Sequence, residues 1–172
     1  MLTAVTDEPL RELEPARLGD HIDRLYRAAI GLCGSHADAE DLVQETYLQV
    51  LRKPRFLRSD DDLGYLMRVL RNTFNSRYRT AARRPRTVEI EDHSERPEPR
   101  TSVRPEPAAE VAEVLAAVTA LPPPYRETVA AVDLAGLSYR EAARALRTRE
   151  GTVMSRLHRG RAMVADALGY SS

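Results

Sequence analysis

The chain of 172 residues contains one cysteine, no tryptophan and only two phenylalanines. A single cysteine, Cys33, excludes an internal disulfide, and its place at the end of an apolar helix face favours a core position over a redox sensor. No secretory signal and no apolar run of membrane length is present, so we expect a cytoplasmic protein. Aromatic residues make up 5% of the chain and β-branched residues do not run together, which disfavours a sheet-based enzyme and predicts an all-α fold.

Potential metal ligands do not group along the sequence. His21, Cys33 and His36 lack the spacing that is typical of zinc ligands. We therefore expect neither a metal ion nor a cofactor.

Charge is balanced overall but segregated along the chain. The formal net charge is zero, yet residues 64–87 contain arginines and no acidic residue, whereas the first 53 residues are acidic on balance. Lys53 is the single lysine, which reflects genome composition more than selected chemistry. Because the charges are segregated, the net charge of zero does not exclude a polyanionic partner.

Residues 18–84 are expected to form three helices. The first runs from about Leu18 to Cys33 and ends at Gly34. Ser35 then provides an N-cap for a second helix that Pro54 stops, and a third helix follows a short loop and ends before Pro85. The apolar stripes expected to be buried are Ile22, Leu25, Tyr26, Ala29, Ile30 and Cys33, then Leu42, Val43, Thr46, Tyr47, Val50 and Leu51, and finally Leu63, Leu66, Met67, Leu70, Phe74 and Tyr78.

A proline-rich segment separates this unit from a second one. Residues 85–107 carry five of the eleven prolines, mixed charge and almost no apolar periodicity, so they cannot offset the entropy of folding alone. The prediction is two small helical domains joined by a flexible linker. Its parts are an N-terminal tail at 1–17, a first domain at 18–84, the linker at 85–108 and a second domain at 109–172, with helices near 109–120 and 125–134.

The stretch 136–162 is typical of a helix-turn-helix. Ser138 and Glu141 form a capping box, residues 147–149 make the turn, and Val153 and Leu157 give the second helix a buried side. Arginine and hydroxyl side chains on the other side suit the major groove of DNA. That outer surface contains Arg149, Glu150, Gly151, Thr152, Met154, Ser155, His158 and Arg159.

Both predicted domains resemble a known family. The segments "HADAEDLVQETYLQVLRK" and "YLMRVLRNTFNSRYRTAARRP" are similar to the core domain of bacterial sigma factors. The segment "LPPPYRETVAAVDLAGLSYREAARALRTREGTVMSRLHRGRA" looks like region 4 of the extracytoplasmic-function branch. This resemblance implies a non-catalytic subunit that binds core RNA polymerase, recognises promoter DNA and helps to open the duplex.

The resemblance assigns the first contact to the second helix. In the family this helix binds the clamp helices of the polymerase β′ subunit, and an acidic, amide-rich face suits a basic partner. From the residues alone, a solvated face stabilised by the helix dipole explains the same acids. The side chains concerned are Asp38, Asp41, Gln44, Glu45 and Gln49.

The third helix and the loop before it are similar to the segment that melts and reads the minus-10 element. Arginines would hold a DNA strand and amides would read base edges. Phe56 could stack on an extruded base, and a core position explains it equally well. The residues implied are Phe56, Arg58, Arg68, Arg71, Asn72, Asn75, Arg79 and Arg83.

Some positions depart from the family pattern. Tyr65 and Ser76 replace the usual tryptophan and aspartate, and in the turn Arg147 and Arg149 replace glycine and the serine cap. The turn is therefore expected to be strained or differently shaped. Met154 occupies a position where the family often has a basic residue. The minus-35 sequence that this chain prefers is therefore expected to differ from the sequence preferred by members with a basic residue there.

Two other functions compete with this interpretation. A conventional helix-turn-helix regulator would form a stable homodimer and bind duplex DNA without polymerase. A resolvase would need an α/β nucleophile domain, which the sequence lacks. The resemblance also allows an anti-sigma factor as a partner, and the linker stretch "EIEDHSE" can be read as a nucleic-acid mimic or as a plain solvated segment.

Overall fold

The computed structural model describes residues 10–57, 61–83 and 105–170. The fold within these ranges is helical, with one two-stranded antiparallel sheet of two residues per strand. In chain order the elements are β1 (Arg11–Glu12), α1 (Pro15–Leu18), a 3-10 turn η1 (Gly19–His21), α2 (Ile22–Cys33), α3 (His36–Leu51), β2 (Phe56–Leu57), α4 (Asp62–Arg83), α5 (Pro105–Thr119), α6 (Pro123–Val129), a π-helical turn η2 (Ala130–Leu134), α7 (Tyr139–Leu146) and α8 (Glu150–Ala167). The all-α prediction is confirmed.

Helices α2, α3 and α4 form the first domain, and their ends follow the predicted caps. Gly34 ends α2 in the left-handed conformation with φ of 74°, and the Ser35 side chain accepts a hydrogen bond from the Asp38 backbone N–H, which starts α3. Leu25, Leu42 and Leu70 are fully buried between the three helices. This packing fixes the outer faces of α3 and α4 relative to each other.

Three residues predicted for the buried stripes are exposed instead. The exposed fractions are 46% for Ile22, 52% for Leu51 and 67% for Tyr78. Each lies near the end of its apolar stripe, where no neighbouring helix covers it among the described residues. Helical periodicity gives the side of a helix but not how far the partner helix extends along it.

The predicted tail 1–17 also contains structure from residue 10 onward. Residues 11–12 form β1, Leu13 and Leu18 are buried, and α1 begins at Pro15, where proline suits the first turn. The helix predicted from Leu18 starts with the 3-10 turn η1 and becomes α-helical at Ile22.

The second domain contains α5 to α8, with α5 beginning at Pro105, inside the predicted linker. Most of that linker, residues 85–104, lies outside the described residues. Ser138 and Glu141 complete the capping box, and the hydrogen bonds from the Ser138 hydroxyl and backbone hold the pKa of Glu141 below its usual range. The box is therefore intact at neutral pH and is lost as the pH falls through that lowered pKa.

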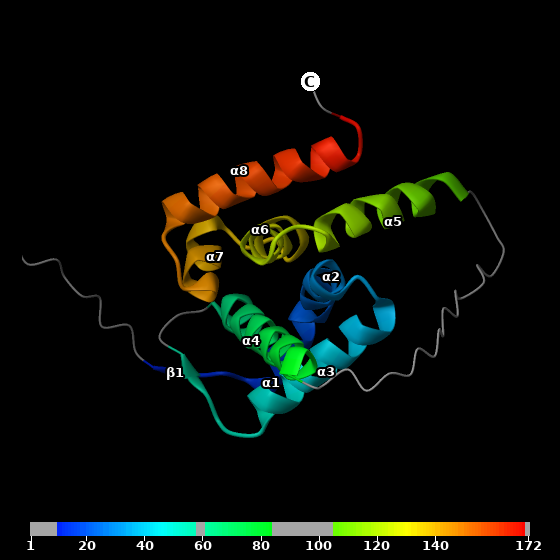
Figure 1. Ribbon diagram of the computed structural model, residues 1–172. Coiled ribbons are helices and arrows are strands. Elements are labelled where there is room, and N and C mark those ends of the chain that lie inside the picture. The colour runs from blue at the N-terminus through cyan, green and yellow to red at the C-terminus, as the bar shows by residue number, and fades with distance from the viewer. Residues whose placement is uncertain (1–9, 58–60, 84–104, 171–172) are drawn as a thin grey trace, which may run out of the picture.

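The two domains pack against each other. Figure 1 shows α2 at the centre, with α3 and α4 on one side and α5, α6 and α8 on the other. The Arg24 guanidinium donates to the carbonyls of Ala135 and Gly136, each at 2.7 Å, and a Cβ at Gly31 would collide with the Leu134 side chain. One apolar cluster consequently runs through both domains, which the sequence had predicted as separate bodies.

The turn between α7 and α8 carries backbone strain. Arg147 has φ of 53°, the only positive value for a non-glycine residue in the described parts of the chain. A left-handed conformation costs a residue with a Cβ about 1–2 kcal/mol, and glycine loses roughly 0.5–1 kcal/mol more entropy on folding.

We expect Arg147→Gly to raise the free energy of unfolding by about 0.5 kcal/mol, as the relief of strain outweighs that entropy. Urea denaturation measures the change. Arg140→Gly, in the first turn of the same helix α7 where φ is helical, is the matched control and should lower stability by roughly 1 kcal/mol. Equal losses in both variants would contradict the assignment of strain to the turn.

Candidate functional site

The outer face of α3 carries the acidic and amide side chains of the first predicted site. Asp38, Asp41 and Gln44 are exposed on this face. Glu45 and Gln49 are half-buried because they turn toward α4, where Glu45 accepts a hydrogen bond from Arg77 Nε at 2.7 Å. The five predicted residues therefore divide between an open face and a polar contact with α4.

That polar contact is continuous along α3 and α4. Gln49 donates to Glu45 at 3.2 Å, and Thr73 donates to Gln49 at 3.3 Å. The Arg77 guanidinium also donates to the Asp41 carbonyl. Glu45 and Gln49 thus hold α4 in place, whereas Asp38, Asp41 and Gln44 remain exposed.

Sequence reasoning missed an apolar component of the same face. Leu48 is 61% exposed and lies one turn beyond Gln44 on α3. Together with Ile22 and Leu51 it borders a shallow hollow of about 480 Å³ between α2 and α3. Exposed leucines that gather beside carboxylates form a surface suited to a partner with both apolar and basic side chains. The signal was present in the sequence, since Leu48 falls outside the buried stripe.

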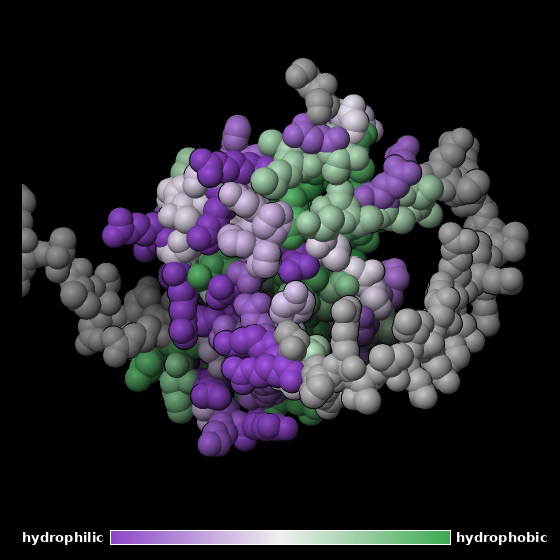
Figure 2. Space-filling view, viewed as in Figure 1, coloured by the Kyte–Doolittle hydropathy of each residue, from purple (hydrophilic) through white to green (hydrophobic). Residues whose placement is uncertain are grey.

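Helix α4 presents most of the predicted minus-10 residues on one side. Positions 68, 71, 72, 75, 79 and 83 fall within one arc of an α-helix with 3.6 residues per turn. Asn72, Arg79 and Arg83 are exposed there, and hydrophilic side chains cover α4 on the face in Figure 2. Arg68 is half-buried, with its guanidinium 6.0 Å from the centre of the Tyr65 ring. The arc is a positively charged strip along the helix.

Two members of this arc are occupied by the second domain. Glu127 of α6 accepts hydrogen bonds from Arg71 Nε at 2.6 Å and from Asn75 Nδ2 at 3.0 Å. The Glu127 side chain is only 9% exposed, so this ion pair is largely shielded from water. Sequence reasoning could not have found it, because nothing local to Glu127 indicates a partner 56 residues away.

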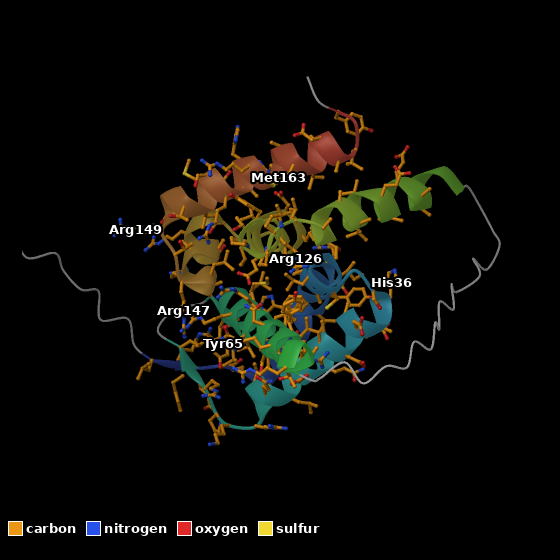
Figure 3. All side chains as sticks on the ribbon, viewed as in Figure 1. His36, Tyr65, Arg126, Arg147, Arg149 and Met163 are labelled. Atoms are coloured by element: carbon orange, nitrogen blue, oxygen red, sulfur yellow. The ribbon has the colours of Figure 1, made fainter. Side chains whose placement is uncertain are left out.

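Further contacts hold α4 and its N-terminal end against the second domain. The Arg126 guanidinium lies 5.4 Å from the Phe74 ring centre, between the domains in Figure 3. At the other end, Arg144 of α7 donates to Asp61 at 3.0 Å. The positively charged strip on α4 is therefore only partly accessible in this arrangement.

Phe56 lies in β2, and its side chain is 59% exposed, which excludes the core position that the sequence left open. Leu57 points the other way and packs against the core. Arg58 lies outside the described residues. An aromatic ring held outward on a strand offers a flat apolar surface.

The outer side of α8 carries the residues that the sequence predicted for the recognition surface. Met154 is 54% exposed, Val153 and Leu157 are buried, and a Cβ at Gly151 would meet open space. Arg149 occupies the N-cap without a side-chain cap bond, and its guanidinium projects away from the helix end in Figure 3. The exposed members are Arg149, Glu150, Gly151, Met154, Ser155, His158 and Arg159, while Thr152 is half-buried.

Cys33 is poorly suited to redox chemistry. Burial, with a smaller effect of the Asp38 carboxylate, raises the pKa of its thiol to about 11. The thiol is consequently protonated at neutral pH, whereas the thiolate is the reactive form. No group of three or more metal-ligating side chains is found in the described ranges.

The two domains match two family descriptions. Residues 18–84 match Sigma-70 region 2, and residues 111–164 match Sigma-70, region 4. The chain is 35% identical to the ECF RNA polymerase sigma factor EcfG of Rhodopseudomonas palustris, over 86% of this chain and 80% of that protein.

The chain belongs to the ECF RNA polymerase sigma factors. It is 36% identical over 88% of its length to SigE of Mycolicibacterium smegmatis, of which it spans 60%. It is 34% identical over 87% of its length to SigM of Mycobacterium tuberculosis strain H37Rv, of which it spans 74%.

Two solved structures share the fold across both domains. The sigma factor RpoE of Bartonella quintana, crystallised in complex with the anti-sigma factor NepR, matches with a TM-score of 0.73 and 27% identity, over 91% of this chain and 97% of that one. CnrH, in complex with the cytosolic domain of CnrY, matches with a TM-score of 0.64 and 22% identity, over 91% and 88%, and supports the fold alone. No helix of this sigma factor in the described ranges is long and apolar enough to span a membrane.

Proposed function

We propose that this chain binds core RNA polymerase and directs it to promoters, as a specificity subunit and not as a catalyst. The observation that supports this most is the placement of one acidic and apolar face on α3 and two basic surfaces on α4 and α8, in the family's order along the chain. Polymerase is a cytoplasmic enzyme in bacteria, so the chain would act in the cytoplasm.

The α3 face is the proposed polymerase contact. Asp38, Asp41 and Gln44 supply negative charge and hydrogen-bond acceptors, and Leu48 and Leu51 supply apolar area. The resemblance implies the clamp helices of the β′ subunit as the partner. Charges around the rim would steer association, while the two exposed leucines, once covered by the partner, would contribute most of the affinity.

The α4 strip with Phe56 is the proposed minus-10 reader. Arginines along the strip would hold the phosphates of the single strand, and Asn72 and Asn75 would meet base edges. Phe56 would stack on a base that has left the duplex, and stacking of this kind contributes about 1–3 kcal/mol per base. That gain offsets the cost of unstacking, which favours the open duplex.

Helix α8 is the proposed minus-35 reader. It is the second helix of the helix-turn-helix, and its exposed His158 and Arg159 offer donors to base edges and phosphates. Met154 would contribute apolar contact where a basic residue is frequent, for example with a thymine methyl group. The upstream sequence that this chain prefers would therefore differ from the one preferred by relatives with a basic residue at this position.

Promoter binding would require the two domains to separate. While both donate to Glu127, Arg71 and Asn75 are half-buried against the second domain and the charge of Arg71 is paired, so both are less available to a DNA strand. The structural match to a sigma factor in complex with an anti-sigma factor extends across both domains, so the packed arrangement resembles that of a relative bound to such a partner. We therefore propose an anti-sigma factor as a partner that stabilises this packed state.

Co-elution with core polymerase tests the proposal. On size-exclusion chromatography the purified chain should elute as a monomer alone and with polymerase when the two are mixed. A stable homodimer that binds palindromic duplex DNA without polymerase would instead support a conventional helix-turn-helix regulator.

Arg159→Ala is expected to weaken recognition of the upstream element by about tenfold, because one arginine contact to a base edge contributes roughly 1–3 kcal/mol. Fluorescence anisotropy of the assembled holoenzyme on labelled upstream DNA measures the loss, and polymerase affinity should be unchanged. Arg161→Ala is the matched control, since Arg161 lies on the same helix but pairs with Asp133. Equal losses in both variants would contradict a specific role for Arg159.

A further inference from the structure

A short strand near the start of the chain lies against the segment that carries Phe56. In the antiparallel pair of β1 and β2, Glu12 is opposite Phe56 and Arg11 is opposite Leu57. The Leu13 N–H extends the pairing by donating to the Arg55 carbonyl at 2.8 Å. Phe56 is therefore held by a strand that belongs to neither domain predicted from the sequence.

Both ends of this strand are anchored in the first domain. Leu13 is 6% exposed and joins the core, and the Tyr47 hydroxyl donates to the Leu18 carbonyl at 2.7 Å, which ties α1 to α3. Arg11 forms an ion pair with Asp62, the first residue of α4, whose side chain is 2% exposed. A carboxylate this deeply buried needs a counter-charge, so Arg11 is firmly fixed.

We propose that β1 and Arg11 position Phe56 to receive the unstacked minus-10 base. The proposal rests on the proposed function of Phe56 and adds a role for residues 11–13. The pairing keeps Leu57 inward and Phe56 outward, and Arg11 ties the strand to the helix that carries the arginine strip. Arg11 is a positioning residue, since it acts on the base through Phe56.

The physical benefit is preorganisation. A two-residue strand has little stability by itself, and ordering one residue costs about 1–2 kcal/mol of backbone entropy. Because β1 orders the Phe56 segment before DNA binds, the free energy of stacking is not reduced by the cost of ordering that segment. Destabilising β1 should then lower the contribution of the stacked base to DNA affinity more than it lowers the affinity for polymerase.

The test uses the chain assembled with core polymerase and promoter DNA whose minus-10 segment is single-stranded, with each base removed in turn. The wild-type holoenzyme should lose roughly tenfold in affinity at one position, as expected for one stacked base. Phe56→Ala should abolish that loss. Arg11→Met and Glu12→Gly should reduce it to less than about threefold, and Arg11→Lys, which retains the charge, should restore most of it.

Polymerase affinity and thermal melting of the variants provide the folding controls, and Glu12→Gly changes an exposed residue without touching the ion pair. The inference is overturned if Arg11→Met and Glu12→Gly retain the wild-type response while Phe56→Ala abolishes it. If removal of each base lowers the DNA affinity of the wild-type and Phe56→Ala holoenzymes equally, Phe56 does not stack on a base. That result would contradict the proposed function of Phe56 itself and not only the role of β1.

Discussion

Glu127→Gln is expected to open the packed arrangement and to raise the affinity of the free chain for single-stranded minus-10 DNA by about tenfold. Glu127 accepts hydrogen bonds from both Arg71 and Asn75, so its carboxylate occupies donors that would otherwise bind DNA. Hydrogen bonds to charged groups contribute about 1.5–3 kcal/mol, and 1.4 kcal/mol corresponds to a tenfold change in an equilibrium. Loss of the charge therefore shifts the population toward separated domains.

Two measurements follow that shift. Small-angle X-ray scattering should report a larger radius of gyration, and fluorescence anisotropy with a labelled single strand should report the tighter binding. Asp133→Asn is the matched control, because it removes a carboxylate that pairs with Arg161 inside the second domain. A Glu127→Gln variant that remains as compact as the wild type and binds DNA no better would show that this contact does not limit access to α4.

Leu48→Asp is expected to weaken the association with core polymerase by at least about thirtyfold. Burial of a leucine side chain contributes about 1.5–3 kcal/mol, and a carboxylate placed in the same apolar contact would also have to be desolvated. Leu48 is 61% exposed in the chain alone, so the substitution should leave folding intact.

Titration of labelled chain with purified polymerase measures this loss, and circular dichroism checks the fold. Val111→Asp is the matched control, because Val111 is similarly exposed, at 58%, on α5. An unchanged affinity for Leu48→Asp, or an equal loss for Val111→Asp, would remove the α3 face from the polymerase contact.

Local sequence signals predicted the elements of this fold well. Ser35 and Ser138 cap the helices for which they were proposed, and Gly34 ends α2 in the expected conformation. Caps are predictable because the residues that form them lie within a few positions of each other. The helix-turn-helix was found for the same reason, and Arg147 adopts the left-handed conformation that its place in the turn requires.

Contacts between distant segments could not be predicted in this way. The pairing of Glu127 with Arg71 and of β1 with β2 depends on how the domains pack, and no spacing in the sequence specifies it. The strand β1 is too short for an alternating pattern to be read. Exposed apolar residues such as Ile22 were assigned to the core because periodicity alone cannot show where a neighbouring helix ends.

Run-off transcription with purified core polymerase, on a promoter library randomised at both elements, tests the central claim most directly. The chain should direct initiation at defined sites that share two motifs at a fixed spacing, one read by α8 and one by α4 with Phe56. Transcription that starts at random sites, or no association with core polymerase at all, would contradict the account.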